Sequence, residues 1–165
     1  MRKQLMTALT AFLVFGFVSA EDKCTHFPEC WPEGSAMHTG LVLVQRQAAV
    51  EKRLEENHSE LLMLVSSETQ AEHSVAPDER LLGALTIQQA AWLKYRSEEC
   101  ELIGSLTGAG GTWPSTYANR CNLNHTEHRN RRVRSAIRCI KRLPRETRTF
   151  GQNRCLQQLA PLTKK

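Results

Sequence analysis

Three residues with metal-binding side chains lie close together in the sequence: Cys121, His125 and His128. On a helix, spacings of four and three residues place this thiol and both imidazoles on one face, and Zn²⁺ prefers such ligands. A structural zinc site needs a fourth ligand, and none is evident nearby. A disulfide bond also competes for the sulfur of Cys121. We therefore expect a disulfide at this position and neither a metal nor another cofactor.

Other catalytic signatures are equally weak. The glycine-rich stretch 104–112 has no Lys after its last Gly and no strand before it, unlike a phosphate-binding loop. Cys24 and Cys30 are separated by five residues, whereas redox motifs separate their cysteines by two. No local signature brings a Ser, a His and an acidic residue together. The sequence therefore predicts a protein that is not an enzyme.

The N-terminal twenty residues resemble a secretory signal peptide. Arg2 and Lys3 precede an apolar run over 5–18, and the small residues before Glu21 suit cleavage there. The run is short for a membrane span, and no later segment is long enough. We expect residues 1–20 to be removed, and the mature chain to be periplasmic or secreted without spanning a membrane.

The mature chain is electrically polarised. Residues 21–112 hold 7 Lys+Arg against 15 Asp+Glu, a net −8, and residues 113–165 hold 13 against 2, a net +11. The two halves either attract each other within the fold or present separate faces to oppositely charged partners. Nucleic acid fits the basic half but not export.

Hydrophobic periodicity predicts three long helices. The first covers about 41–66, after an irregular leader over 21–39 that contains Pro28, Pro32 and Gly34. The second begins at Pro77 and ends near Ser105. The third runs from about 114 to 143, with a break near 122–124 left open, and a basic tail follows over 144–165 that could add one or two helical turns. No segment has the pattern of a strand, so we expect an all-α antiparallel bundle of three main helices.

Polar residues share the apolar faces of the second and third helices. Gln89, Trp92 and Arg96 fall on the stripe that includes Leu85 and Cys100. Because buried polar groups require partners, we expect Gln89 and Arg96 to hold loop backbone or a carboxylate. The inner face of the third helix is predicted to comprise Thr126, Arg129, Val133, Ile137 and Ile140.

Six cysteines in an exported chain indicate disulfides. Cys100 and Cys121 flank the loop between the second and third helices, so we expect them to pair. Cys155 follows the turn after Pro144 and can fold back onto Cys139. Cys24 and Cys30 then either close a small ring in the leader, or one of them reaches a helix.

Several of these residues together resemble the lysozyme inhibitor LprI-like family. The run from Gln89 to Arg96, which contains Trp92 and Tyr95, is followed by Cys100, a Gly-Gly-Thr loop and Cys121. Thr126, Arg129 and Val133 then match the family's last helix. The chain departs from the pattern at three positions: Ser97 replaces an Asp, Thr112 a Ser and Val133 a Leu.

The resemblance implies a small exported helical domain, here over 40–143, of a family named after a member that inhibits lysozyme, and it implies no catalytic residues. It also implies architectural roles: Trp92 as a core anchor, Gln89 and Arg96 as buried polar ties, and Cys100 with Cys121 as a staple. The complete set of matching positions is Gln89, Trp92, Tyr95, Arg96, Gly110, Gly111, Thr126 and Arg129.

Two binding functions follow. In the first, the acidic face of the first helix binds a cationic lysozyme stoichiometrically through Glu51, Glu55, Glu56 and Glu60. In the second, the protein is an envelope accessory that binds a polyanion, such as lipopolysaccharide or an acidic glycan, through Arg131, Arg132, Arg134 and Arg138. A solvated arginine face paired with the acidic helix is the structural alternative.

Overall fold

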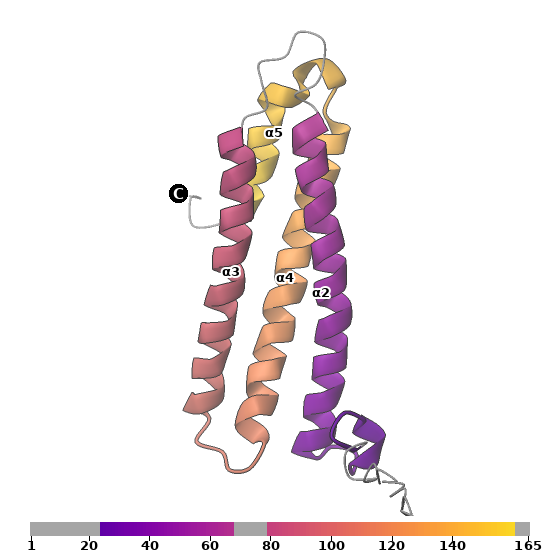
Figure 1. Ribbon diagram of the computed structural model, residues 1–165, viewed down its shortest axis with the longest axis vertical. Helices are drawn as coiled ribbons and strands as arrows, with labels where there is room; N and C mark the ends of the chain where they lie inside the picture. The colour runs from indigo at the N-terminus through magenta and orange to yellow at the C-terminus, as the bar shows by residue number, and fades with distance from the viewer. Residues whose placement is uncertain (1–23, 68–78, 161–165) are drawn as a thin grey trace, which may run out of the picture.

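The computed structural model describes residues 24–67 and 79–160, which form a long helical bundle (Figure 1). The three long helices are α2 (Ala36–Ser67), α3 (Glu79–Leu106) and α4 (Trp113–Arg142). They run up, down and up, so that α3 is antiparallel to both α2 and α4. The all-α bundle of three main helices predicted from the sequence is confirmed. No helix in the described ranges is long and apolar enough to cross a membrane, and residues 1–20, the predicted signal peptide, lie outside those ranges.

The central element is α4, which packs against both α2 and α3, whereas α2 and α3 barely touch each other. Its inner face, Thr126, Arg129, Val133, Ile137 and Ile140, is buried as predicted. The sequence left a break near 122–124 open, and the structure has none there, because α4 continues without interruption from Trp113 to Arg142. Leu123 is buried against Leu43 and Val50 of α2, and this tertiary packing outweighs the low helix propensity of the asparagines.

The first helix begins at Ala36, five residues earlier than its periodicity suggests. The backbone N–H of His38 donates to the hydroxyl oxygen of Ser35 at 3.2 Å, so Ser35 satisfies one of the free donors at the helix start. Before it, a single 3-10 turn, η1 (Pro28–Cys30), is closed by the Cys24–Cys30 disulfide. This short ring is one of the two alternatives that the sequence left open.

The segment after Pro144 is more ordered than the predicted basic tail. It forms η2 (Arg145–Thr147), α5 (Arg148–Leu156) and η3 (Gln157–Leu159), and it folds back along α4 (Figure 1). Cys155, Leu156 and Leu159 are buried in the same apolar cluster as Ile137 and Ile140. The tail therefore extends the core.

Two further disulfides tie the helices together. Cys100–Cys121 joins α3 to α4 with a Cα–Cα distance of 5.4 Å, and Cys139–Cys155 joins α4 to α5 at 5.5 Å. Both pairs are those expected from the order of the helices. Because each bond closes a loop, it restricts the unfolded chain and stabilises the fold by about 2–4 kcal/mol.

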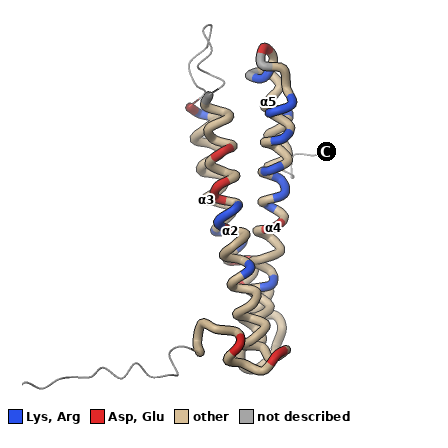
Figure 2. The backbone as a smooth tube through the Cα atoms, turned by 90° about the vertical axis from the view of Figure 1, so that its right-hand side faces the viewer, with Lys and Arg blue, Asp and Glu red and all other residues tan. Residues whose placement is uncertain are grey.

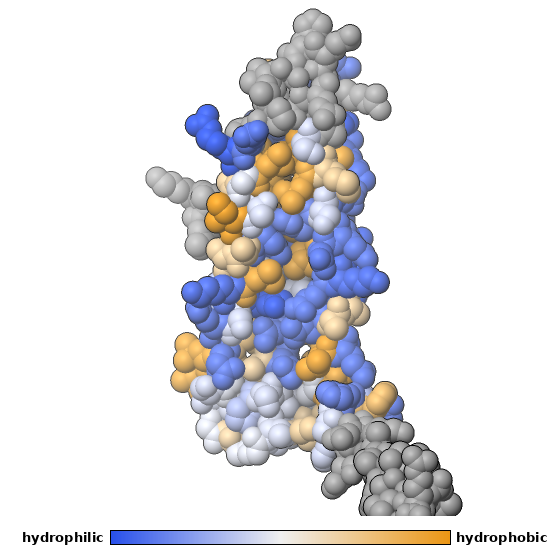
Figure 3. All heavy atoms as spheres, in the orientation of Figure 1, coloured by the Kyte–Doolittle hydropathy of each residue, from blue (hydrophilic) through white to orange (hydrophobic). Residues whose placement is uncertain are grey.

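The core is divided into two apolar parts. The larger surrounds Leu61, Val133 and Ile140, and the smaller consists of Leu43, Val50 and Leu123. Along α4 the two parts are separated by the buried polar residues Thr126, Arg129 and Asn130. On the face seen in Figure 3, apolar side chains form small separate patches among larger hydrophilic areas.

Candidate functional site

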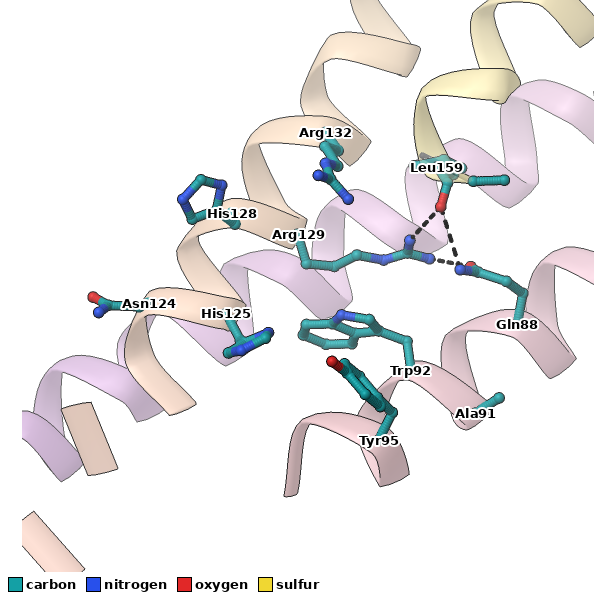
Figure 4. Close-up of a pocket in the computed structure, with 11 residues that line it drawn as sticks. Gln88, Ala91, Trp92, Tyr95, Asn124, His125, His128, Arg129, Arg132 and Leu159 are labelled. Atoms are coloured by element: carbon teal, nitrogen blue, oxygen red, sulfur yellow. Dashed lines mark hydrogen bonds between the residues drawn. The ribbon is translucent and has the colours of Figure 1, made fainter. Parts of the chain in front are cut away.

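A cleft of about 690 Å³ lies between α3 and α4 and is closed at one end by η3 (Figure 4). This volume falls within the range of small-molecule sites, about 300–1,000 Å³. Its walls are aromatic on one side and cationic on the other. The lining residues are Gln88, Ala91, Trp92, Tyr95, Asn124, His125, His128, Arg129, Arg132, Leu159 and Ala160.

Arg129 forms the floor of this cleft and is only 3% exposed. Its Nε donates to Gln89 Oε1 at 3.0 Å, its Nη1 to the carbonyl of Leu159 at 3.1 Å, and its Nη2 to Gln88 Oε1. All three acceptors are neutral. Burial, with a further contribution from the positive charge of Arg132, lowers the pKa of Arg129 to about 10, so the side chain remains charged at neutral pH.

No carboxylate of the described residues forms an ion pair with Arg129, nor with Arg132 at the cleft rim. A buried charge normally requires an opposite charge, because desolvation is only partly offset by neutral hydrogen bonds. In Figure 4, Arg132 points toward Arg129, so two cations converge on one space. The cleft therefore carries an uncompensated positive charge.

The opposite wall is built by α3, where Trp92 and Tyr95 lie one turn apart. The guanidinium of Arg129 lies 5.6 Å from the centroid of the Trp92 ring, and that of Arg96 lies 5.3 Å from it. The ring of Tyr95 meets that of His125 edge-on at 6.2 Å. A hydrogen bond to Glu99 raises the pKa of Tyr95, and His125 Nε2 lies 3.1 Å from the same carboxylate. Trp92 is partly buried and packs against the larger apolar cluster.

Arg96 holds a carboxylate, as the sequence predicted. Its Nη1 lies 2.6 Å from Glu51 Oε1 on α2 and donates to Thr126 Oγ1 at 2.7 Å. The hydroxyl of Thr126 in turn donates a hydrogen bond to the carbonyl oxygen of Asn122 at 2.7 Å. Gln89 differs from the prediction, since its partner is Arg129 and not loop backbone or a carboxylate.

A smaller groove, of about 550 Å³, lies between α2 and α3 and includes Arg96 in its lining. It is lined by Glu51, Leu54, Glu55, His58, Ser59, Gln89, Leu93 and Arg96. Burial, followed by the positive charge of Arg129, lowers the pKa of His58. A pKa below the ordinary value of 6.5 leaves this imidazole neutral at neutral pH. Its Nε2 is buried and has no hydrogen-bond partner among the described residues.

The four acidic residues proposed for partner binding all lie on α2, but only two are free of ion pairs within the described chain. Glu51 pairs with Arg96 and Glu60 with Lys141. Glu55 and Glu56 are exposed. The acidic helix thus makes two attachments within the fold and leaves two carboxylates toward solvent.

The four arginines proposed for polyanion binding are all exposed. They belong to α4, along which Figure 2 shows several basic positions. Arg131 lies 3.8 Å from Glu127 of the same helix, which also lies 3.6 Å from Arg46 of α2. Within the described ranges, no ion pair involves Arg132, Arg134 or Arg138. Only Arg132 of the four lines the cleft.

The candidate metal ligands do not form a coherent site. The Sγ atoms of Cys100 and Cys121 and a ring nitrogen of His125 lie within 4.8 Å of one another, but the two sulfurs are bonded together. Zinc binds cysteine as a thiolate, and sulfurs joined in a disulfide are not thiolates. Cys100 and Cys121 therefore cannot serve as zinc ligands while they are bonded to each other. His128 is exposed and lines the cleft instead.

The Gly-Gly loop positions α3 against α4. Gly108 and Gly111 adopt φ angles of +60° and +64°, which glycine accommodates without strain. Gly110 lies in the same loop and has open space around it. The loop thereby reverses the chain within a few residues and lets Cys100 meet Cys121.

Sequence reasoning located Trp92, Arg129 and Arg132 but not the cleft that they share. Gln88 lies beside the predicted stripe, and Leu159 comes from a segment expected to be a tail. No local pattern marks Leu159, because its contribution is a backbone carbonyl that tertiary folding brings to Arg129.

Fold and site together define a small disulfide-bonded helical protein with a cleft between α3 and α4. Its described residues do not bring together a set of side chains typical of catalysis. The family described as Lysozyme inhibitor LprI matches residues 30–132, and the chain belongs to this family. The match includes all of α2 and α3 and most of α4, but it excludes α5 and η3. No curated protein and no solved structure matches the chain.

Proposed function

We propose that this protein is exported and inhibits lysozyme by binding it stoichiometrically, without chemical turnover. The family match over residues 30–132 supports this function most directly. The predicted signal peptide and the disulfides are consistent with an oxidising compartment outside the cytoplasm. Neither a metal nor a cofactor is required for such a function.

The bundle has features that suit an inhibitor. The Cys100–Cys121 disulfide and the ion pair of Arg96 with Glu51 hold the long helices in one arrangement, which reduces the entropy lost on binding. Glu55 and Glu56 are both exposed on α2, and Glu55 lines the groove that contains His58. Because lysozymes that are cationic attract negative charge, this part of α2 is the proposed contact, and it accelerates association.

The test is a titration of the oxidised chain 21–165 against lysozyme acting on isolated cell walls. We expect activity to disappear near equimolar protein. The double variant Glu55→Gln/Glu56→Gln should weaken inhibition about tenfold and reduce its dependence on salt. Its control, Glu98→Gln/Glu101→Gln on α3, makes the same change of charge and should inhibit as the parent does. Full lysozyme activity at excess protein contradicts the proposal.

The second candidate function is binding of an envelope polyanion by the arginine face of α4. It is favoured by the exposure of Arg131, Arg132, Arg134 and Arg138, three of which have no ion pair within the described part of the chain. Retention on immobilised heparin should fall strongly when all four are replaced by Gln. Elution at the same salt concentration as the parent excludes this candidate.

A further inference from the structure

We propose that the cleft between α3 and α4 binds an acidic saccharide, meaning a pyranose ring that carries a carboxylate. This site is separate from the α2 surface proposed to contact lysozyme, and it does not depend on that function. The carboxylate would lie between Arg129 and Arg132, and the ring would lie against Trp92 and Tyr95 (Figure 4).

The charge of the cleft identifies an anion as the ligand. Arg129 is 97% buried, its three acceptors are neutral, and no described carboxylate pairs with it. Arg132 adds a second positive charge next to it, and the repulsion between these two cations contributes, after burial, to the lowered pKa of Arg129. A bound carboxylate relieves this repulsion and supplies the missing counter-charge. The planar guanidinium groups also match the geometry of a carboxylate.

The aromatic wall identifies the remainder of the ligand. Tyr95 is 54% exposed, and Trp92 presents part of its ring to the same space. Aromatic rings offer a flat apolar surface, which suits the C–H face of a pyranose ring. Around it, Gln88, Asn124 and His128 provide donors and acceptors for hydroxyl groups. This combination of a ring surface, dispersed polar groups and a cationic end favours a charged sugar over a simple inorganic anion.

The end wall is formed outside the region that the family match covers. Leu159 and Ala160 belong to the C-terminal segment held by Cys139–Cys155. The Leu159 carbonyl accepts from both Arg129 Nη1 and Gln88 Nε2, at 3.1 and 3.3 Å, and so fixes both side chains. The cleft is thus completed by a part of this chain that the family match does not include.

The test is an NMR titration of the oxidised chain 21–165, followed at the indole N–H of Trp92 and at the side-chain amide of Gln88. The probes are methyl glucuronide, methyl glucoside without the carboxylate, acetate without the ring, and inorganic phosphate. We expect saturable shifts with the glucuronide and an affinity at least about tenfold above that for each other probe. Equal binding of the glucoside, equal or tighter binding of phosphate, or no saturable shift overturns the proposal.

Variants of exposed residues at the cleft rim test the binding site without removing a buried side chain on which folding depends. Arg132→Gln removes an exposed cation and should weaken glucuronide binding about tenfold, the effect of one charged hydrogen bond. Tyr95→Ala should weaken it less. Arg138→Gln removes an exposed arginine of the same helix that does not line the cleft, and it should bind as the parent does. If both arginine variants lose affinity equally, overall charge explains the binding and the site is refuted.

Discussion

At the scale of single residues, the middle of the bundle buries polar groups where leucine would pack more simply. Asn57 Nδ2 donates to Asn130 Oδ1 at 2.7 Å, and Arg96 links Glu51 to Thr126. Such pairs contribute little net stability, because desolvation offsets much of their attraction. They can be satisfied in only one register, however. We therefore assign to this layer the alignment of α2 and α3 along α4.

The buried imidazole of His58 leads to a prediction about pH. Its folded pKa is lowered below 6.5 by burial and by Arg129, so the unfolded chain binds more protons between that pKa and 6.5. Stability should therefore be fully present above pH 6.5 and fall as the pH decreases through this window. Urea unfolding at about pH 7.5 and about pH 5.5 measures the loss, which His58→Gln should reduce. His128→Gln, at an exposed position, is the control; an unchanged loss in His58→Gln contradicts the assignment.

At the scale of elements, the three long helices could be predicted from the sequence, whereas the short C-terminal helices α5 and η3 could not. Apolar residues such as Leu54 and Leu61 recur with helical spacing, and this pattern defines α2 whatever surrounds it. Residues 145–159 are mostly basic and polar in sequence. The segment α5–η3 is held in place by the buried apolar residues Cys155, Leu156 and Leu159 and by the Cys139–Cys155 disulfide, none of which has a helical periodicity that could be recognised beforehand. The cleft escaped prediction for the same reason, since Gln88, Arg129 and Leu159 meet only through tertiary folding.

Two glycines of α3 should respond to alanine in opposite directions. At Gly104 an added Cβ would lie 2.7 Å from the carbonyl oxygen of Pro114 and 3.2 Å from Ala118 Cβ, so α3 and α4 would have to separate. Gly104→Ala should therefore lower the free energy of unfolding by about 1–3 kcal/mol. A Cβ added at Gly83 would have no heavy atom within 4 Å. Gly83→Ala should therefore raise the free energy of unfolding by about 0.5–1 kcal/mol, because alanine has the higher helix propensity. Urea denaturation distinguishes the signs; stabilisation by Gly104→Ala would refute the close contact.

At the scale of the whole molecule, charge and covalent bonds organise different parts. The acidic half and the basic half pack side by side, yet few of the described ion pairs join them: Lys141 with Glu60, and Arg46 with Glu127. His125 adds one with Glu99 when it is protonated. Most arginines of α4 are exposed to solvent, and Figure 2 shows how basic positions recur along this helix. Attraction between the halves therefore involves only some of the charged side chains, and the exposed arginines of α4 that have no described ion pair are available to a partner.

The Cys139–Cys155 bond should control both the stability of the C-terminal segment and the shape of the cleft. The bond joins cysteines 16 residues apart and holds the segment that places the Leu159 carbonyl against Arg129. Cys139→Ser/Cys155→Ser should lower the free energy of unfolding by about 3 kcal/mol. Amide exchange should accelerate first in α5 and η3, because this segment has few other buried contacts.

The matched control is Cys24→Ser/Cys30→Ser, which opens a ring between cysteines only 6 residues apart in a segment that contacts α2. Its effect on stability should be smaller, and exchange in α5 should not change. If instead both double variants accelerate exchange throughout the bundle, the C-terminal segment unfolds together with the three long helices. The cleft would then be an inseparable part of the core, and the end wall formed by Leu159 could not open by itself.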